Sequence, residues 1–267
     1  MTSSDTVIDT VIAALRSGHD ALAATVSSFS DDDLARPSGS SEWDVSEVLS
    51  HLGSGAEIGR ATLAAALAGA PAPGRDFMTS VWDRWNAMTR RLRADGFLRS
   101  NRALTELYES LDAETRANLR VDLGFLPEPL DVAALGRMRL SELTLHAWDV
   151  HVAFDEHATL APDAVPHLLD GAPGLIGWAG KPERLDGERA AVLVTTTEPA
   201  TEFTLRLDER ITVDSDLPDK PDGTLLLPAE AWLRLVAGRL APRHTPEGVA
   251  TTGAADLGLL RRVFPGY

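Results

Sequence analysis

The chain has 267 residues, of which 40 are acidic and 25 basic, so its formal net charge is −15. This acidic balance argues against binding to a nucleic-acid backbone or an anionic membrane surface, because both require a basic face. The sequence contains no cysteine, which excludes disulfides, thiolate metal ligands and a cysteine nucleophile, so any metal site must use histidine, aspartate and glutamate.

No apolar run in the sequence reaches the roughly 18 residues that a membrane-spanning helix needs. The N-terminal segment MTSSDTVIDTVIAAL lacks the basic start and the apolar block of a secretory signal peptide. We therefore expect a cytoplasmic protein. A hydrophobic content of 44% is ordinary for a globular protein, and the length allows one large domain or two modest ones.

The first half of the chain is predicted to be helical, because apolar residues recur there at helical spacing. A turn-rich connection, SDDDLARPSGSSEW, follows the first helix, and Ser41 or Asp44 is a possible cap for the second. The segment APAPG then ends the second helix. The expected long helices cover residues 5–29, 44–69, 78–95 and 131–154, and a shorter helical region is expected over residues 100–118. Four long helices joined by loops suggest an antiparallel bundle.

The second half of the chain changes character after Pro162. A helical stretch to Trp178 is followed by four segments rich in valine, threonine and leucine, which predict strands: AAVLVTTTE, EFTLRLD, RITVDSD and GTLLLP. A helix is expected after Pro228, a residue suited to a helix start, and another over about 255–264. The predicted fold is α+β, with a helical bundle over residues 1–157 and a small α/β domain over residues 158–267.

Glu142 and His146 stand four residues apart in the last helix of the bundle, so both side chains leave the same side of that helix. A helical wheel places them, with Arg139 and Asp149, inside an apolar face. Burying an unpaired carboxylate is costly, so buried charges are normally paired or bound to a metal. One interpretation is an internal network that joins Arg139 to Glu142 and His146 to Asp149; the other is a metal site.

His51 favours the metal interpretation. It lies on the apolar face of the helix predicted for residues 44–69, where Gly55, one turn later, is expected to leave room beside the imidazole. Inward-facing histidine and glutamate side chains from facing helices build the metal sites of bundles. His51, Glu142 and His146 would leave one coordination position open, as catalytic zinc sites do. Zn²⁺ is the expected ion, with Fe²⁺, Ni²⁺ and Mn²⁺ as alternatives.

Glu47 precedes His51 by four residues and forms a second Glu-x-x-x-His pair. Two-metal bundles use Glu-x-x-His, which these helices lack, so we interpret Glu47 as a first-turn surface residue or as a residue that supports a ligand. Asp149, one turn beyond His146, is the better supporting candidate. Four tryptophans of the helical half are expected in core packing or beside the metal: Trp43, Trp82, Trp85 and Trp148. A basic cluster is expected at a solvated helix C-terminus: Arg90, Arg91 and Arg93.

The segments EWDVSEVLSHL around His51 and RMRLSELTLHAWDVHVA around Glu142 and His146 resemble the mycothiol-dependent maleylpyruvate isomerase family. The segments WDRWNAM and AEAWLRLVAGRL are also similar, and the likeness covers nearly the whole chain. The resemblance implies a DinB-like metal-binding four-helix bundle, followed by a small α/β domain similar to sterol-carrier-protein-like folds. It also implies a zinc ion held by His51, Glu142 and His146, whose open position takes mycothiol as thiolate.

The resemblance further implies that an arginine of the C-terminal domain points toward the cofactor or the substrate. Arg239, in VAGRL, is the best match by motif for this catalytic and cofactor-binding role. Arg84 and Asn86, in WDRWNAM, are expected to face the same cleft, Arg84 also as a cofactor-binding residue.

The predicted function is therefore that of a zinc-dependent enzyme, which activates a thiol for attack on an electrophilic small molecule as an isomerase or a thiol S-transferase. The same ligands would serve a hydrolase or lyase that uses metal-bound water, which is the first alternative. The second is a non-catalytic binding module that carries a hydrophobic ligand in its C-terminal domain. The expected partners are a small thiol and a small electrophile, without nucleic acid or membrane, in a monomer or a homodimer.

Overall fold

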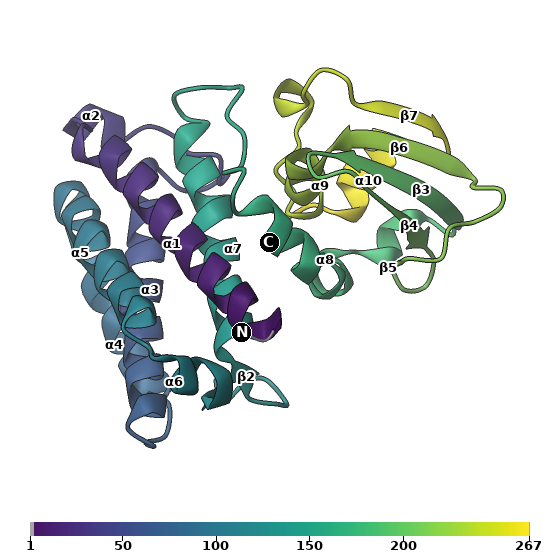
Figure 1. The fold of residues 1–267 in the computed structure, drawn as a ribbon. Coiled ribbons are helices and arrows are strands. Elements are labelled where there is room, and N and C mark those ends of the chain that lie inside the picture. Colours follow the sequence, from purple (N-terminus) through teal and green to yellow (C-terminus); the bar gives the residue numbers. More distant parts are fainter. Residues whose placement is uncertain (1–2, 267) are drawn as a thin grey trace. The chain divides into compact units, whose positions relative to one another are not determined.

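The computed structural model describes residues 3–266 of the chain (Figure 1). The chain divides into two compact units, Met1–Asp155 and Glu156–Tyr267, and the boundary expected after residue 157 lies shortly beyond this division. The first unit is built mainly of helices, whereas the second combines helices with a five-stranded sheet. The mixture of helix and sheet confirms the predicted α+β class.

Four long helices form the body of the first unit, and shorter elements connect them (Figure 1). The long helices are α1 (Ser3–Ser27), α3 (Val45–Leu67), α5 (Arg90–Glu109) and α7 (Val132–His151). The shorter helices are α2 (Asp31–Leu34), α4 (Arg75–Asn86) and α6 (Ala113–Asn118). Two short antiparallel strands, β1 (Arg120–Val121) and β2 (Leu130–Asp131), precede α7.

Helices α3 and α7 each begin at a side-chain cap. The Glu47 N–H donates to the Asp44 side chain at 2.9 Å, and the Asp44 N–H donates to the Glu47 side chain at 2.9 Å. This reciprocal arrangement is a capping box, which satisfies two N–H groups at the start of a helix. Asp44, not Ser41, is therefore the cap of α3, and Glu47 is occupied as its partner. Asp131 caps α7 by accepting from the Ala134 N–H at 2.7 Å.

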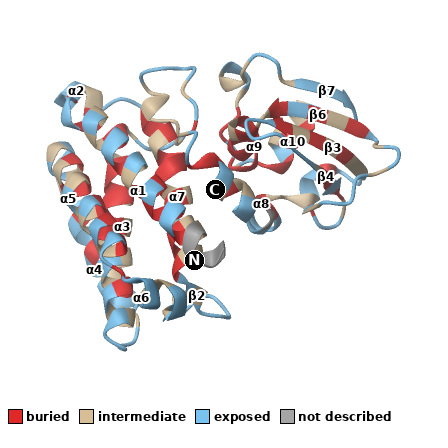
Figure 2. Ribbon diagram, viewed as in Figure 1, coloured by how far each residue is buried: buried red, intermediate tan, exposed pale blue. Residues whose placement is uncertain are grey.

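The core of the first unit lies between the long helices, where α3 packs along α5 and α1 along α7. Figure 2 shows buried residues on the sides of these helices that face one another. Several of the core side chains have no exposed surface: Val11, Leu22, Leu49, Leu52, Phe97, Leu140 and Val150. Helix α3 also contacts α7, so the two helices that carry the candidate ligands lie against each other. Within residues 3–266, no helix is long and apolar enough to cross a membrane.

The region predicted as one helix over residues 78–95 is two helices. Helix α4 ends at Asn86, and α5 begins at Arg90 behind Thr89, whose side chain accepts from the Leu92 N–H. A threonine cap at this point starts a new helix. This helix continues through residues 96–99, where a break between two helices was expected, and ends at Glu109. The expected helix over residues 100–118 is likewise divided, because Asp112 caps the separate helix α6.

Because this region forms two helices, the basic cluster lies at a helix N-terminus and not at the expected C-terminus. Arg90, Arg91 and Arg93 occupy the first turn of α5, where positive charge is unfavourable to the helix dipole. Arg90 pairs with Asp44 at 2.9 Å and Arg91 with Asp31 at 3.0 Å, so carboxylates of other segments offset that charge. The expectation of a helix C-terminus here is wrong.

The second unit contains helix α8 (Val165–Ala179) and a five-stranded sheet in the order β5-β4-β3-β6-β7. The strands are β3 (Ala190–Thr197), β4 (Thr201–Leu207), β5 (Thr212–Asp214), β6 (Gly223–Pro228) and β7 (Ala250–Gly253). The pair β3–β6 is parallel, and the other pairs are antiparallel. The remaining helices are α9 (Ala229–Val236), α10 (Leu257–Val263) and two 3-10 helices, Pro182–Leu185 and Pro242–His244.

Alternation along the strands builds the core of the second unit. Val192, Val194 and Thr196 of β3 are buried, whereas the residues between them are partly exposed. This pattern directs one face of the sheet toward an apolar layer, in which Trp232 of α9 is 1% exposed. Strand β7 was not expected from the sequence, because all four of its residues are exposed at the sheet edge and show no apolar alternation.

Candidate metal centre

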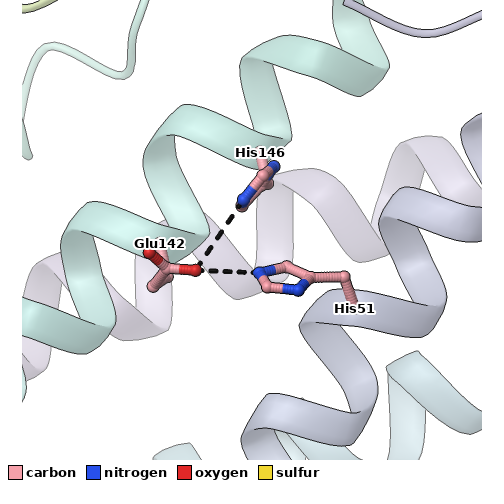
Figure 3. Close-up of side chains that lie close together, drawn as sticks. All are labelled: His51, Glu142 and His146. Atoms are coloured by element: carbon pink, nitrogen blue, oxygen red, sulfur yellow. Dashed lines mark hydrogen bonds and ion pairs between the residues drawn. The ribbon is translucent and has the colours of Figure 1, made fainter. Parts of the chain in front are cut away.

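The side chains of His51, Glu142 and His146 converge between α3 and α7, as Figure 3 shows. The His51 Nε2 atom lies 2.9 Å from Glu142 Oε2, and the His146 Nε2 atom lies 3.7 Å from the same oxygen. One ligand atom from each residue lies within 4.8 Å of the others. Two nitrogen or oxygen ligands of one tetrahedral Zn²⁺ stand roughly 3.3 Å apart. The separations of 2.9 and 3.7 Å bracket that value, so the donor set fits a single ion.

The three side chains differ in exposure, and this difference gives the centre an open side. His146 is 6% exposed, whereas the side chains of His51 and Glu142 are 38% and 36% exposed. A small molecule can therefore approach the carboxylate and the His51 imidazole from solvent, while His146 anchors the set in the bundle. This arrangement differs from a closed structural site, in which protein ligands occupy every position.

The charge state of Glu142 suits cation binding. Burial would raise the pKa of the Glu142 carboxyl, but the hydrogen bond to His51 and electrostatic interactions with His146, His51 and Arg139 lower this pKa to about 2. The carboxyl group is therefore ionised at neutral pH. An ionised carboxylate beside two imidazole nitrogens is a ligand set that zinc and related divalent cations prefer.

Asp149 orients the His146 ring, as its place one turn later predicts. Its side chain has no exposed surface, and its Oδ2 atom lies 2.8 Å from His146 Nδ1. Because an ionised carboxylate can only accept, Nδ1 donates this hydrogen bond, and Nε2 is left to face Glu142. Carboxylates behind histidine ligands of metals commonly fix the tautomer in this way.

A loop before α3 closes on Asp149. The Gly39 N–H donates to the Asp149 backbone oxygen at 2.8 Å. A Cβ atom at Gly39 would lie 2.8 Å from Asp149 Oδ1 and from Val152 Cγ1, and 2.9 Å from Trp148 Cζ3. Only glycine allows so close an approach without displacement of its neighbours. The loop that starts here also carries Trp43 to the centre.

Trp43 is the tryptophan that lies beside the candidate ligands. Its ring centroid is 5.3 Å from that of His51 and 6.1 Å from that of His146, and the residue is 36% exposed. Trp85 and Trp148 are instead buried in the core, and Trp82 is exposed on α4. The ring of Trp43 therefore lies beside both imidazoles.

Only half of the internal network considered from the sequence is formed. His146 does pair with Asp149, but within residues 3–266 no ion pair joins Arg139 to Glu142. The Arg139 Nη2 atom instead donates to the Leu52 backbone oxygen at 2.9 Å and to Asn101 Oδ1 at 2.6 Å. The position of Arg139 also accounts for the small residue at position 55, because a Cβ atom added to Gly55 would lie 3.4 Å from Arg139 Nη1. The space at Gly55 therefore holds the guanidinium, and the expectation that it serves the imidazole is corrected.

Asn101 is a residue of this region that the sequence reasoning missed. Its side chain is 2% exposed, and its amide bridges Arg139 and His19. The available signal was its position at helical spacing between two apolar residues, Phe97 and Leu104. A polar side chain on that face indicates a buried partner.

Three further residues were predicted from the sequence to act in catalysis. Arg84 lies exposed on α4 and forms an ion pair with Glu57, which also accepts from Trp85 Nε1 at 3.0 Å. Glu57 stands six residues beyond His51, roughly 120° away around α3. Asn86 ends α4, and its backbone oxygen accepts from Arg93 Nη2 at 2.8 Å. No contact among the described residues brings Arg84 or Asn86 to the ligand set.

Arg239 belongs to the second unit. It lies shortly after the end of α9 and directly follows Gly238. It is 8% exposed, and its Nη1 atom donates to the Ala237 backbone oxygen at 2.9 Å. Gly238 has a φ of 72°, in the left-handed region that glycine favours. The tight turn at Gly238 therefore sets the backbone direction at Arg239. A catalytic role for Arg239, like those of Arg84 and Asn86, stays a prediction.

Residues 15–151 match the family model of the mycothiol maleylpyruvate isomerase N-terminal domain. Among solved structures, the chain is similar to the crystal structure of the mycothiol-dependent maleylpyruvate isomerase, with a TM-score of 0.64 and 13% sequence identity. The similarity covers 96% of this chain and 98% of that chain. The crystal structure of a histidine-to-alanine mutant of that isomerase matches with the same values. No curated protein matches the chain. The family match spans more than half of the sequence and all three candidate ligands, and the chain therefore belongs to the mycothiol maleylpyruvate isomerase N-terminal domain family.

Proposed function

We propose that this protein is a metal-dependent enzyme that uses a small-molecule thiol, mycothiol, to attack an electrophilic small molecule. The observation that carries the proposal is the convergence of His51 Nε2 and His146 Nε2 on Glu142 Oε2, at 2.9 and 3.7 Å. Membership of the family supports the thiol. The structural likeness to a complete mycothiol-dependent isomerase supports a shared fold over both units.

The proposed metal is Zn²⁺, although another divalent cation suits the same ligands. His51, Glu142 and His146 would hold it. A bound cation of this kind lowers the pKa of a coordinating thiol, so that the thiol is present as thiolate at neutral pH. The chain itself has no cysteine, so the sulfur nucleophile has to come from a small molecule.

The chain's own residues have distinct parts in this proposal. Asp149 holds His146 in the tautomer whose Nε2 faces Glu142. Trp43 forms an aromatic wall beside both imidazoles, which can contact a substrate and exclude water from it. Arg239, Arg84 and Asn86 are proposed to bind the thiol or the substrate; their cationic and amide groups suit carboxylate and hydroxyl partners.

The proposed reaction begins with addition of the thiolate to an electrophilic carbon. In a cis–trans isomerisation, a carbon–sulfur bond forms at one carbon of a conjugated double bond, and the electron pair moves onto the conjugated carbonyl group. Rotation about the resulting single bond follows, and the returning electron pair expels the thiolate unchanged. In an S-transfer, the thiolate instead displaces a leaving group or opens an epoxide, and the sulfur stays attached to the product.

Metal analysis and a thiol requirement test this proposal together. Purified protein would be compared with the His51→Ala and His146→Ala variants for bound metal, and then assayed on maleylpyruvate and simple epoxides with and without mycothiol. We expect near-stoichiometric metal in the wild-type protein alone, and turnover only with mycothiol. Equal metal in all three proteins would refute the ligand assignment. Turnover without thiol would favour the hydrolase or lyase alternative, in which water is the nucleophile.

A second candidate function rests on a cavity in the second unit. The cavity has a volume of about 390 Å³ and is lined by residues of α8, β4, β5 and α9, among them Ile176, Phe203 and Trp232. Its size is that of a small-molecule pocket, and most of its lining surface is apolar, although Asp170, Glu202 and Asp214 also line it. This observation favours a role in carrying a hydrophobic ligand. Native mass spectrometry of the purified protein tests it, since an apolar ligand should copurify.

We also propose finer assignments for the two folds. Four long helices with ligands on two facing members support a DinB-like metal-binding bundle for the first unit. The second unit has a five-stranded mixed sheet with buried α9 beside it, which supports a sterol-carrier-protein-like domain.

A further inference from the structure

A chain of polar side chains crosses the interior of the bundle next to the candidate metal ligands. Its centre is Arg139 on α7, whose Nη2 atom donates to the Leu52 backbone oxygen of α3 at 2.9 Å. The same Nη2 atom donates to Asn101 Oδ1 of α5 at 2.6 Å. One guanidinium therefore bonds to two helices other than its own.

The chain continues from Asn101 to the fourth helix. Because a guanidinium can only donate, the amide oxygen of Asn101 faces Arg139, and its NH₂ group faces away. That Nδ2 atom lies 3.0 Å from Nδ1 of His19 on α1. His19 is 4% exposed and Asn101 is 2% exposed. The series His19–Asn101–Arg139–Leu52 thus takes one member from each of the four long helices.

The position of Arg139 links this series to the metal ligands. Arg139 lies three residues before Glu142, so the two side chains leave neighbouring positions on α7. Leu52, whose carbonyl oxygen it binds, directly follows His51 on α3. The contact therefore joins the two ligand-bearing helices at the level where His51 Nε2 meets Glu142 Oε2.

A partly buried guanidinium is a costly group to place at this contact. Within residues 3–266, the Arg139 Nε atom is buried and has no hydrogen-bond partner. Burial lowers the pKa of Arg139 to about 10, so the group still enters the core as a cation at neutral pH. Well-packed apolar residues often stabilise a fold as well as buried charges do. Fold stability alone therefore does not account for arginine here. The two N–H bonds of its Nη2 atom lie in the rigid plane of the guanidinium and point in fixed directions, which suits the bridging of two acceptors.

We propose that Arg139 is a positioning residue for the metal centre. By bonding to the Leu52 carbonyl and to Asn101, it fixes the separation and rotation of α7 against α3, and so the distance between His51 and the pair formed by Glu142 and His146. The proposal rests on the proposed function only in requiring that these three residues bind a divalent cation. It does not depend on the thiol or on the substrate.

Two other roles for Arg139 predict different results. As a distant positive charge it would repel a divalent cation, so that a neutral replacement would bind metal more tightly and Arg139→Lys would behave as the wild type. As a packing residue alone it would affect unfolding but not the geometry of the bound ion. A positioning residue requires the planar guanidinium, because its N–H bonds have fixed directions, whereas the ammonium of a lysine rotates freely and cannot hold the two acceptors in a set orientation.

The test compares Arg139→Lys, Arg139→Gln and Asn101→Ala with the wild-type protein. Arg137→Lys is the matched control, because Arg137 lies on the same helix and has no hydrogen bond or ion pair within the described part of the chain. Zn²⁺ affinity would be measured by competition with a chromophoric chelator. The visible absorption spectrum of bound Co²⁺ would report coordination geometry, and thermal unfolding of the metal-free proteins would report stability.

We expect Arg139→Lys and Arg139→Gln to weaken Zn²⁺ binding by about tenfold or more, in the range typical of residues behind metal ligands, and to change the Co²⁺ spectrum. Asn101→Ala should do so to a smaller degree without a change of charge, and it carries the test if the arginine variants do not fold. Arg137→Lys should match the wild type. Wild-type affinity and spectrum in the lysine variant would overturn the proposal while leaving the proposed function intact. Failure of the wild-type protein to bind Zn²⁺ or Co²⁺ would overturn both.

Discussion

His146 Nδ1 lies 2.8 Å from Asp149 Oδ2, and this bond decides which ring nitrogen of His146 faces Glu142. Asp149 is one turn further along α7 and has no exposed surface. The same helix therefore supplies two candidate ligands and the residue that orients one of them. The second imidazole, that of His51, comes from α3, and its approach depends on how the two helices pack.

Replacement of Asp149 should weaken metal binding without removing any ligand. We expect Asp149→Ala to lower Zn²⁺ affinity by about 10–100-fold, because His146 loses the partner that fixes its tautomer. Asp149→Asn should have a smaller effect, since the amide oxygen still accepts from Nδ1. Chelator competition gives the affinities. Asp83→Asn, on the exposed surface of α4, is the control, and an Asp149→Ala protein with wild-type affinity would contradict this role.

A methyl group at Gly39 should displace the loop from Asp149. The added Cβ would approach Asp149 Oδ1 and Val152 Cγ1 to 2.8 Å, so we expect Gly39→Ala to lower the free energy of unfolding by about 1–3 kcal/mol. Urea titration measures this change. Gly74→Ala is the comparison, because a Cβ there would meet no atom within 4 Å. Equal stability of the two variants would show that the loop yields freely.

Trp43 should report metal binding through its fluorescence. Its ring lies 5.3 Å from that of His51 and 6.1 Å from that of His146, so Co²⁺ at the centre should quench its emission. We expect most of the Co²⁺-dependent quenching to disappear in Trp43→Phe, with metal affinity unchanged because Trp43 supplies no ligand atom. Trp82→Phe, exposed on α4, should retain it. Undiminished quenching in Trp43→Phe would place the ion elsewhere.

Protonation of His19 should destabilise the fold as the pH falls. Burial lowers the pKa of His19 below its ordinary value of 6.5, and Asn101 needs Nδ1 as an acceptor. The unfolded chain therefore takes up this proton first, so the stability that His19 contributes is present above its unfolded pKa and is lost as the pH falls through and below it.

Urea unfolding at about pH 7.5 and about pH 5.5 measures this effect, which is limited to about 1.4 kcal/mol per pH unit for one group. We expect the free energy of unfolding to fall more steeply with acidification in the wild-type protein than in His19→Gln. His157→Gln, whose parent side chain is 84% exposed, should follow the wild type. Identical slopes in all three proteins would exclude a contribution of His19.

Spacing along the helices predicted which side chains converge between α3 and α7, because residues four apart share one helix face whatever the tertiary structure. Glu142 and His146 needed only this periodicity, and His51 was identified by its place on a second apolar face. The partner of Arg139 could not be predicted in the same way. Glu142 is its neighbour in sequence, but the Leu52 carbonyl and Asn101 compete for the guanidinium, and they come close only when the bundle has formed.

The limits of prediction in the fold have similar causes. Residues 78–95 show continuous helical spacing, yet the local cap at Thr89 starts a separate helix, which turns the basic cluster into a helix N-terminus. Strand β7 is held by pairing with β6, and its exposed side chains carry no periodic signal. Periodicity predicts elements that bury one face, but it does not detect elements that depend on backbone pairing alone.

The most direct test of the central claim, that this centre activates a thiol, is the absorption spectrum of Co²⁺-substituted protein during titration with mycothiol. The account predicts a strong near-ultraviolet band from thiolate bound to Co²⁺, which appears in the wild-type protein and is lost in His51→Ala and His146→Ala. A centre that holds Co²⁺ through these residues, yet shows no spectral change at millimolar mycothiol, would contradict it.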